Sequence, residues 1–139
     1  MAEEMSEDPY IPLIGSLPAH ADRDAALAWI QRQQSRHVEG VGFSFCIADR
    51  QDHATGSAGL WTHDFWEGRA TAGYAIRPSA RGRGLAAHAL RALTEFGFTL
   101  PLLQRVELYI EPDNWASRRT AERVGYLLEG TLRQHQEIG

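Results

Sequence analysis

The chain has 139 residues, 43% of them hydrophobic, with a net charge of −4 and a single cysteine. This length suits one domain with one core, and the apolar content, including four tryptophans, excludes a disordered chain. The acidic balance argues against nucleic-acid binding, one cysteine excludes an intrachain disulfide framework, and no apolar run reaches the length of a membrane span.

The front of the chain is predicted to hold an arm and a helix. Residues 1–18 contain three of the six prolines and few periodic apolar positions, so we expect an irregular arm whose clustered acids are mobile. These acids are unlike a secretory signal, which favours a cytoplasmic location. Asp22 or Asp24 is a suitable N-cap for a helix that continues to about His37, with Trp29 on its apolar face.

Three β-strands are predicted to follow as an antiparallel meander. Residues 41–49 alternate large apolar with smaller side chains, and residues 57–62 and 71–76 form the next two strands. Pro78 ends the third strand because proline has no N–H group for a ladder. Cys46 lies on the small-residue face of the first strand with no activating cation or helix start in view, so a structural role is expected.

A glycine-rich loop connects the third strand to a helix. It reads Arg81-Gly82-Arg83-Gly84, and apolar residues recur at helical spacing from Leu85. No Ser, Thr, Asp or Asn stands just before this helix to bind its first N–H groups. Free N–H groups, the positive end of the helix dipole and two guanidinium groups predict an anion site that suits phosphate. The alternative is a glycine turn whose arginines are solvated.

Two other phosphate-binding motifs fit this loop poorly. A Walker loop requires a Gly-Lys-Ser/Thr ending, which is absent here. The spacing Gly82-x-Gly84-x-x-Ala87 satisfies a loose dinucleotide fingerprint, but that fingerprint directly follows a strand in a larger sheet. Here residues 77–80 intervene, and the chain is too short for such a sheet.

A strand, a helix and a last strand are predicted beyond the central helix. Residues 105–110 alternate as a strand, and the helix that crosses over from the third strand implies a parallel pair with a right-handed connection. Asp113 or Asn114 is a natural N-cap for a helix that ends at Val124, and residues 126–133 form the last strand. The predicted fold class is α+β, a mixed, largely antiparallel sheet with flanking helices around a strand–glycine loop–helix–strand unit.

Several motifs occur in an order that resembles one enzyme superfamily. The loop from Arg81 to Ala86 matches the Arg/Gln-x-x-Gly-x-Gly/Ala pattern of the GNAT N-acetyltransferases. The accompanying motifs are Gly73-Tyr74-x-Ile76, Glu111-Pro-Asp-Asn114-x-x-Ser117, Glu122-x-x-Gly125-Tyr126 and Glu129-Gly130-x-Leu132-Arg133. This ordered set covers roughly the last two-thirds of the chain. It resembles the RimJ/RimL branch, whose members acetylate protein N-termini and whose relatives act on amino acids, polyamines and antibiotics.

The resemblance implies the acyl-CoA N-acyltransferase fold, with acetyl-CoA as co-substrate. The third strand would pair its backbone with the pantetheine arm, and the loop amides would hold the pyrophosphate. Asn114 would contact the arm where the two parallel strands splay apart, and Arg119 or Arg118 would either reach the adenosine phosphate or be solvated. The implied cofactor-binding residues are Tyr74, Ala75, Ile76, Arg77, Arg81, Gly82, Arg83, Gly84, Leu85, Ala86, Asn114, Ser117 and Arg119; no metal site is expected.

Acetyl transfer to an amine also requires a proton for the departing thiolate and a base for the amine. By resemblance, Ser117 is the catalytic acid; the alternative is a first-turn serine bonded to the backbone. The expected position of the base holds Gln136, which cannot accept a proton, and its neighbours His135 and Glu137 point to the other face of a regular strand. The remaining options are His63, Asp64 or a water relay, while Trp61, Phe65 and Trp66 either line the acceptor entrance or cover the core.

We expect residues 1–139 to form a single domain that lacks the first strand and helix and the last strand of the family. The chain is then a fragment, a shortened gene product, or a subunit whose sheet edges are completed by a partner, such as the second copy in a homodimer. The first functional hypothesis is an acetyl-CoA-dependent N-acetyltransferase acting on a protein N-terminus or a small-molecule amine. The competing hypotheses are a non-catalytic acyl-CoA-binding or regulatory protein and a structural interaction fragment.

Overall fold

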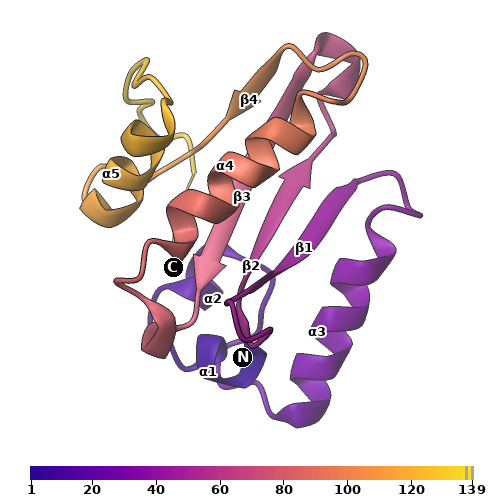
Figure 1. The fold of residues 1–139 in the computed structure, drawn as a ribbon, viewed down its shortest axis with the longest axis vertical. Coiled ribbons are helices and arrows are strands. Elements are labelled where there is room, and N and C mark those ends of the chain that lie inside the picture. Colours follow the sequence, from indigo (N-terminus) through magenta and orange to yellow (C-terminus); the bar gives the residue numbers. More distant parts are fainter. Residues whose placement is uncertain (137, 139) are drawn as a thin grey trace.

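The computed structural model describes residues 1–136 and 138 and confirms the predicted α+β class (Figure 1). The elements in chain order are α1 (Ala2–Ser6), α2 (Ile11–Ile14), α3 (Arg23–Ser35), β1 (Gly42–Ala48), β2 (Ala54–Trp61), the short 3-10 helix η1 (Phe65–Glu67), β3 (Arg69–Ile76), the 3-10 helix η2 (Pro78–Ala80), α4 (Leu85–Gly97), β4 (Arg105–Glu107) and α5 (Trp115–Val124). Within the described residues, no helix combines the length and apolarity needed to cross a membrane.

The sheet has the order β1-β2-β3-β4. Its first three strands form an antiparallel meander, and β4 lies parallel to β3 after the crossover through α4. This confirms the predicted mixed sheet and its strand–loop–helix–strand unit. Figure 1 shows α4 lying along β3 and β4, with α3 beside β1 and the N-terminal helices near the end of β3 that leads into the loop.

The two faces of the sheet carry side chains of different size. One face bears Phe43, Ile47 and Leu60, which pack in one hydrophobic cluster with residues of α4 such as Leu90 and Leu93. Leu60 and Leu90 are completely buried in this cluster. The strand register places small side chains in line on the opposite face, since neighbouring residues of a strand point to opposite sides. These small residues are Ser44, Cys46, Ser57, Gly59, Thr71, Gly73 and Ala75.

The small-residue face is covered by the N-terminal part of the chain. Met5, Ile11, Leu17 and Trp29 from α1, α2, α3 and their connections form a second buried cluster, against which Ala75 of β3 packs. The prediction of an irregular, mobile arm is therefore wrong. The short segments between the prolines still fold here because they bury their apolar side chains together, and local periodicity does not reveal this burial.

Helix α3 follows the prediction more closely. The Asp22 carboxylate accepts a hydrogen bond of 2.9 Å from the N–H of Ala25, so Asp22 rather than Asp24 is the N-cap. The helix ends at Ser35, two residues before the predicted His37. Arg36, the residue after its end, turns back toward the sheet and donates a hydrogen bond of 3.2 Å to the Ser44 hydroxyl.

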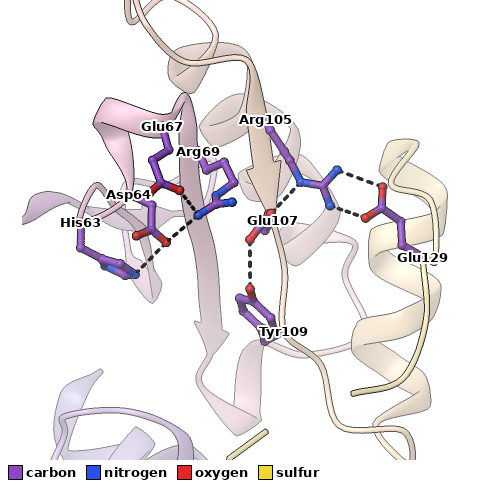
Figure 2. A network of polar contacts seen from close by, with 8 residues as sticks. All are labelled: His63, Asp64, Glu67, Arg69, Arg105, Glu107, Tyr109 and Glu129. Atoms are coloured by element: carbon purple, nitrogen blue, oxygen red, sulfur yellow. Dashed lines mark hydrogen bonds and ion pairs between the residues drawn. The ribbon is translucent and has the colours of Figure 1, made fainter. Parts of the chain in front are cut away.

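The predicted last strand is absent from the described residues, and β4 is shorter than expected. Ladder pairing between β3 and β4 ends at Thr71 and Glu107, so residues 108–110 are not part of the sheet. After α5 the chain is held by side chains instead of by a ladder, through the ion pair of Arg105 with Glu129 shown in Figure 2. A three-residue edge strand offers too few backbone groups to fix another strand in register.

Candidate functional site

The glycine loop has the backbone conformation that its sequence predicts. Gly82 and Gly84 adopt φ angles of 75° and 74°, in the left-handed region that favours glycine. A Cβ atom added at either position would meet no protein atom within 4 Å, so the space in front of the loop is open. Gly84 is also the N-cap of α4 and provides no side chain to cap it. The start of α4 therefore faces open space with bare backbone.

The N–H groups of the loop and first helical turn are available for a ligand. Among the described residues, no group accepts a hydrogen bond from the N–H groups of residues 82–87. The Nε atom of the nearby Arg77 is buried and also lacks a hydrogen-bond partner in this part of the structure. The buried Nε of Arg77 without a partner is costly, and the exposed N–H groups at the start of α4 are positioned to bind an anion.

Each arginine of this region is held by a carboxylate from elsewhere in the chain. The pairs are Arg77 with Glu4 at 3.2 Å, Arg81 with Asp8 at 2.7 Å, and Arg83 with Asp49 at 3.5 Å. Glu4 in addition accepts a hydrogen bond of 2.8 Å from the N–H of Ser79. The predicted alternative of simply solvated arginines is therefore wrong, because the acids fix these side chains while leaving part of each guanidinium exposed.

Asp8 is the most buried of these acids. Its carboxylate also accepts hydrogen bonds of 2.9 Å from the N–H groups of Tyr10 and Ile11, which begin α2. Burial on its own would raise the pKa of the Asp8 carboxyl, but the bonds from Ile11, Tyr10 and then Arg81 together lower it. Asp8 thus connects the fold of the N-terminal arm to the position of a loop arginine.

The two parallel strands separate beside the loop, as the resemblance implied. Strand β3 continues to Ile76 although its pairing with β4 ends at Thr71. The N–H of Arg77 donates to Thr55 of β2 at 2.9 Å, so by the alternation of a strand the N–H groups of Tyr74 and Ile76 point away from β2. The carbonyl of Ile76 accepts a bond of 3.1 Å from Arg81 Nε. A short open strand edge therefore leads from the loop into the fold.

A cavity of about 990 Å³ lies on the small-residue face of the sheet and extends to this open edge. It lies between the N-terminal helices and the sheet, where the strands carry small side chains and the Trp61 ring packs over Gly59 and Gly73. The predicted residues that line it include Tyr74, Ala75, Asn114, Ser117, Gln136, Trp61 and His63. A volume of this size accommodates an extended ligand and a second small molecule.

Asn114 and Ser117 meet at the start of α5. Asn114 is the N-cap, and its side-chain oxygen accepts a hydrogen bond of 3.0 Å from the Ser117 N–H. The Ser117 hydroxyl itself bonds no backbone group in the described structure, in contrast to the alternative considered for it, while its carbonyl accepts a bond of 3.4 Å from the Tyr74 hydroxyl. Its half-buried side chain lines the cavity with the hydroxyl free.

The predicted alternatives for the base are separated by the structure. Gln136 lines the cavity, whereas Glu137 lies outside the described residues and His135 stacks on Tyr109 with ring centroids 4.6 Å apart. His63 lines the cavity and lies 3.8 Å from Asp64, whose carboxylate also pairs with Arg69 at 3.9 Å (Figure 2). The network in Figure 2 therefore includes both His63 and Asp64, and the His63 side chain stays largely exposed.

Comparison with known proteins decides the family. A family model described as an acetyltransferase (GNAT) domain matches residues 2–127. The chain belongs to the GNAT acetyltransferase family. Among curated proteins, this GNAT chain is 29% identical to the uncharacterized N-acetyltransferase p20 of Bacillus licheniformis over 94% of its own length and 74% of p20.

Solved structures place the fold among RimL-like enzymes, as the motifs suggested. One relative is a Vibrio cholerae protein, provisionally named a ribosomal-protein-serine acetyltransferase, with 26% identity and a TM-score of 0.66 over 75% of this chain and 60% of that protein. Another is RimL, the ribosomal L7/L12 alpha-N-protein acetyltransferase in complex with coenzyme A, with 22% identity and a TM-score of 0.72 over 85% of this chain and 66% of RimL. This GNAT chain thus spans less than two thirds of the length of either protein.

The structure brings most of the predicted residues of this GNAT chain to one region, but Trp66, Arg118 and Arg119 are not among the cavity residues. The open edge of β3 and the start of α5 line the cavity, and the loop follows directly after β3. Trp66, by contrast, is 87% exposed and is not among the cavity residues. Arg118 stacks on Trp115 and donates to the carbonyl of Pro112 at 3.1 Å, whereas Arg119 is exposed with no ion pair among the described residues.

Sequence reasoning missed five residues that line or fix the site. They are Glu4, Asp8, Tyr10, Arg36 and Glu111. Burial, followed by the neighbouring Glu111 carboxylate, raises the pKa of the Tyr10 hydroxyl, which also accepts a bond of 3.5 Å from Asn114. Four of the five come from segments before the motif-bearing region, where no sequence motif points to a functional role. Glu111 was quoted as part of a motif without a role.

Proposed function

We propose that this chain transfers an acetyl group from acetyl-CoA to a primary amine, either a protein N-terminus or a small molecule. The observation that carries the proposal is the set of free N–H groups at residues 82–87, which face open space at the end of the strand whose open edge lines the cavity. Family membership supports the reaction class, and the co-substrate supplies the acetyl group as a thioester.

The residues of the chain fit such a co-substrate. The N–H groups from Gly82 to Ala87 and the half-exposed Arg81 and Arg83 side chains would bind its diphosphate, and the orphaned Nε of Arg77 adds a donor. The N–H groups of Tyr74 and Ile76 would bind the pantetheine arm in the manner of an added strand. Arg119 is the exposed cation left to contact the adenosine phosphate.

Ser117 would provide the proton that the departing thiolate needs. Its hydroxyl lines the cavity, bonds no backbone group, and is held in place because its N–H caps the helix through Asn114. A fixed hydroxyl at the cavity wall can donate a proton without a large rearrangement.

The amine must lose a proton, and among the described residues that line the cavity we consider Glu111 and His63 as its acceptor. Glu111 lies after β4 in the same wall as Asn114 and Ser117, and His63 lies on the opposite side of the open edge, in the loop after β2. We favour Glu111 because its neighbours Tyr10 and Asn114 are the residues around the start of α5, where the acid Ser117 lies. Gln136 would contribute hydrogen bonds only.

One experiment tests the proposal in two stages. The melting temperature is measured with and without acetyl-CoA, and thiol release is then followed over a panel of peptides and small amines. Stabilisation by acetyl-CoA together with thiol release that depends on an amine is the expected result. No thermal shift at millimolar acetyl-CoA would refute the proposal.

A second function is favoured by one observation. Gln136 lines the cavity and stands where the resemblance implies a glutamate base, and a glutamine cannot act as a base. A non-catalytic acyl-CoA-binding protein would show the thermal shift with no thiol release for any amine. Thiol release by the wild-type protein therefore separates the two functions, and the Glu111→Gln variant then tests the base, because a protein that uses Glu111 loses turnover while its thermal shift with acetyl-CoA is kept.

A further inference from the structure

The cavity contains a cation that the acetyl-transfer reaction does not use. Arg36 follows the end of α3, is half-buried and lines the cavity. Its Nη1 donates to the Ser44 hydroxyl at 3.2 Å, and its guanidinium carbon lies 4.9 Å from the ring centroid of Trp61. A guanidinium has five N–H donors, and only one of them has a partner among the described residues.

No carboxylate of the described structure pairs with Arg36. The acids that line the same cavity, Glu3 and Glu111, form no ion pair with it. Burial lowers the pKa of the Arg36 guanidinium, and no carboxylate of the described structure raises it again. Every arginine of the glycine loop has an acidic partner, so Arg36 differs from them in keeping its charge uncompensated inside a cavity. A half-buried guanidinium with free N–H donors and no carboxylate partner can bind an anion through charge-assisted hydrogen bonds.

The sheet fixes where Arg36 acts relative to the reaction. The strand register places Ser44, Gly59 and Gly73 in one row, and Gly73 belongs to the open edge of β3. Strands lie about 4.8 Å apart, so Ser44 is about 10 Å from Gly73. A Cβ atom added at Gly59 or Gly73 would lie 3.1 Å or 2.9 Å from the Trp61 ring. The Trp61 indole therefore lies over this row, with Gly73 at the open edge of β3 on one side and Arg36 on the other.

The two ends of the cavity thus carry different polar groups. Glu111 and Ser117 lie in the wall beside the start of α5, and Arg36 lies at the far end of the row. A molecule with an amine at one end and an anion about 5–10 Å away would match both ends. A polyamine would bring a cation toward Arg36 and be repelled.

We propose that Arg36 binds a carboxylate of the amine acceptor, so that the preferred acceptors are primary amines carrying a carboxylate several bonds from the reacting nitrogen. The inference rests on the proposed acetyl transfer. Two sources supply this chemistry: an acidic side chain near a peptide N-terminus, or the terminal carboxylate of a short peptide or amino acid. Arg36 is in this view a specificity residue rather than a participant in proton transfer.

The test compares peptide acceptors that differ only in charge, with spermidine added as a polycationic acceptor. Thiol release is measured with Ser-Glu-Ala-Ala amide, Ser-Gln-Ala-Ala amide, Ser-Gln-Ala-Ala with a free carboxylate, and spermidine. We expect at least one carboxylate-bearing peptide to exceed the neutral amide by about 10–100-fold in kcat/KM, the amount of one or two charge-assisted hydrogen bonds. The two carboxylate arms identify the source, and spermidine is expected to be the poorest acceptor.

Variants then assign the preference to one side chain. Arg36→Gln should reduce the acidic acceptor to the level of the neutral one and change the neutral one less than about 3-fold, while Arg36→Glu should reverse the preference toward Ser-Lys-Ala-Ala amide. Arg32→Gln is the matched control, since Arg32 is exposed on the same helix with no ion pair among the described residues. If Arg36→Gln does not fold, Arg36→Lys and the wild-type panel still decide.

The outcomes distinguish this inference from the proposed function. Equal rates for charged and neutral peptides, or a preference for spermidine, would overturn the role of Arg36 while leaving acetyl transfer intact. If no acceptor is acetylated, calorimetric binding of the same peptides to the coenzyme A-loaded protein replaces the rates. Tighter binding of a carboxylate-bearing peptide, lost in Arg36→Gln, would support the inference, and equal binding would refute it.

Discussion

The free N–H groups of the glycine loop lead to a prediction about Gly84→Ala. Gly84 has φ of 74° and no protein atom within 4 Å of an added Cβ, so the substitution introduces backbone strain without a clash. Strain at such an angle is about 1–2 kcal/mol, which corresponds to a decrease of about 3–8 °C in melting temperature for a chain of this size. The protein should therefore fold.

Binding of coenzyme A should suffer much more than folding. To relieve the strain, the backbone rotates and turns one or more N–H groups away from the bound diphosphate. Loss of a single hydrogen bond to a charged group costs about 1.5–3 kcal/mol, so the dissociation constant should rise about 10–100-fold. Isothermal titration calorimetry with coenzyme A measures this directly.

Gly40→Ala is the matched control for Gly84→Ala. Gly40 has φ of 73°, is exposed and likewise has no atom within 4 Å of an added Cβ, but it lies in the turn between α3 and β1. Both variants should lose similar stability, and only Gly84→Ala should lose affinity. If the two variants bind coenzyme A within about 3-fold of each other, the loop amides do not hold the diphosphate.

Three further predictions concern named side chains. Ser117→Ala should lower kcat at least about 10-fold, because the variant lacks the hydroxyl that donates the proton. The affinity for coenzyme A should be unchanged, because the cap of α5 uses the Ser117 N–H and not its hydroxyl. An equal kcat in the variant would show that Ser117 does not take part in the chemistry. Asp8→Ala should lower the free energy of unfolding by about 3 kcal/mol but Asp8→Asn by only about 1 kcal/mol. The reason is that Asn keeps an acceptor for the two N–H groups and loses only the ion pair with half-exposed Arg81. Equal free energies of unfolding for the two variants in urea would contradict this prediction. The pKa of Asp8 is lowered in the folded state, so its contribution to the free energy of unfolding is complete above about pH 4 and is lost as the pH falls through the pKa of the folded state. The stability difference between wild type and Asp8→Asn should therefore vanish at lower pH.

The amino-acid sequence by itself determined the features that depend on near neighbours. The left-handed glycines at 82 and 84, the uncapped start of α4 and the Asn114 cap of α5 are set by residue types within one turn. The alternation of β1 and the parallel crossover likewise follow from local pattern and chain handedness. These local rules were sufficient to predict the fold class, and the ordered motifs added the family by resemblance.

Only the tertiary structure decided how distant segments complete the site. Glu4 reaches Arg77 and Asp8 reaches Arg81 across more than seventy positions, and Arg36 bonds Ser44 because α3 packs beside β1. The arm and the last strand were mispredicted for the same reason. Whether apolar residues near prolines bury together, or whether a chain finds a strand edge to pair with, depends on partners far away in sequence, and no local pattern encodes those partners.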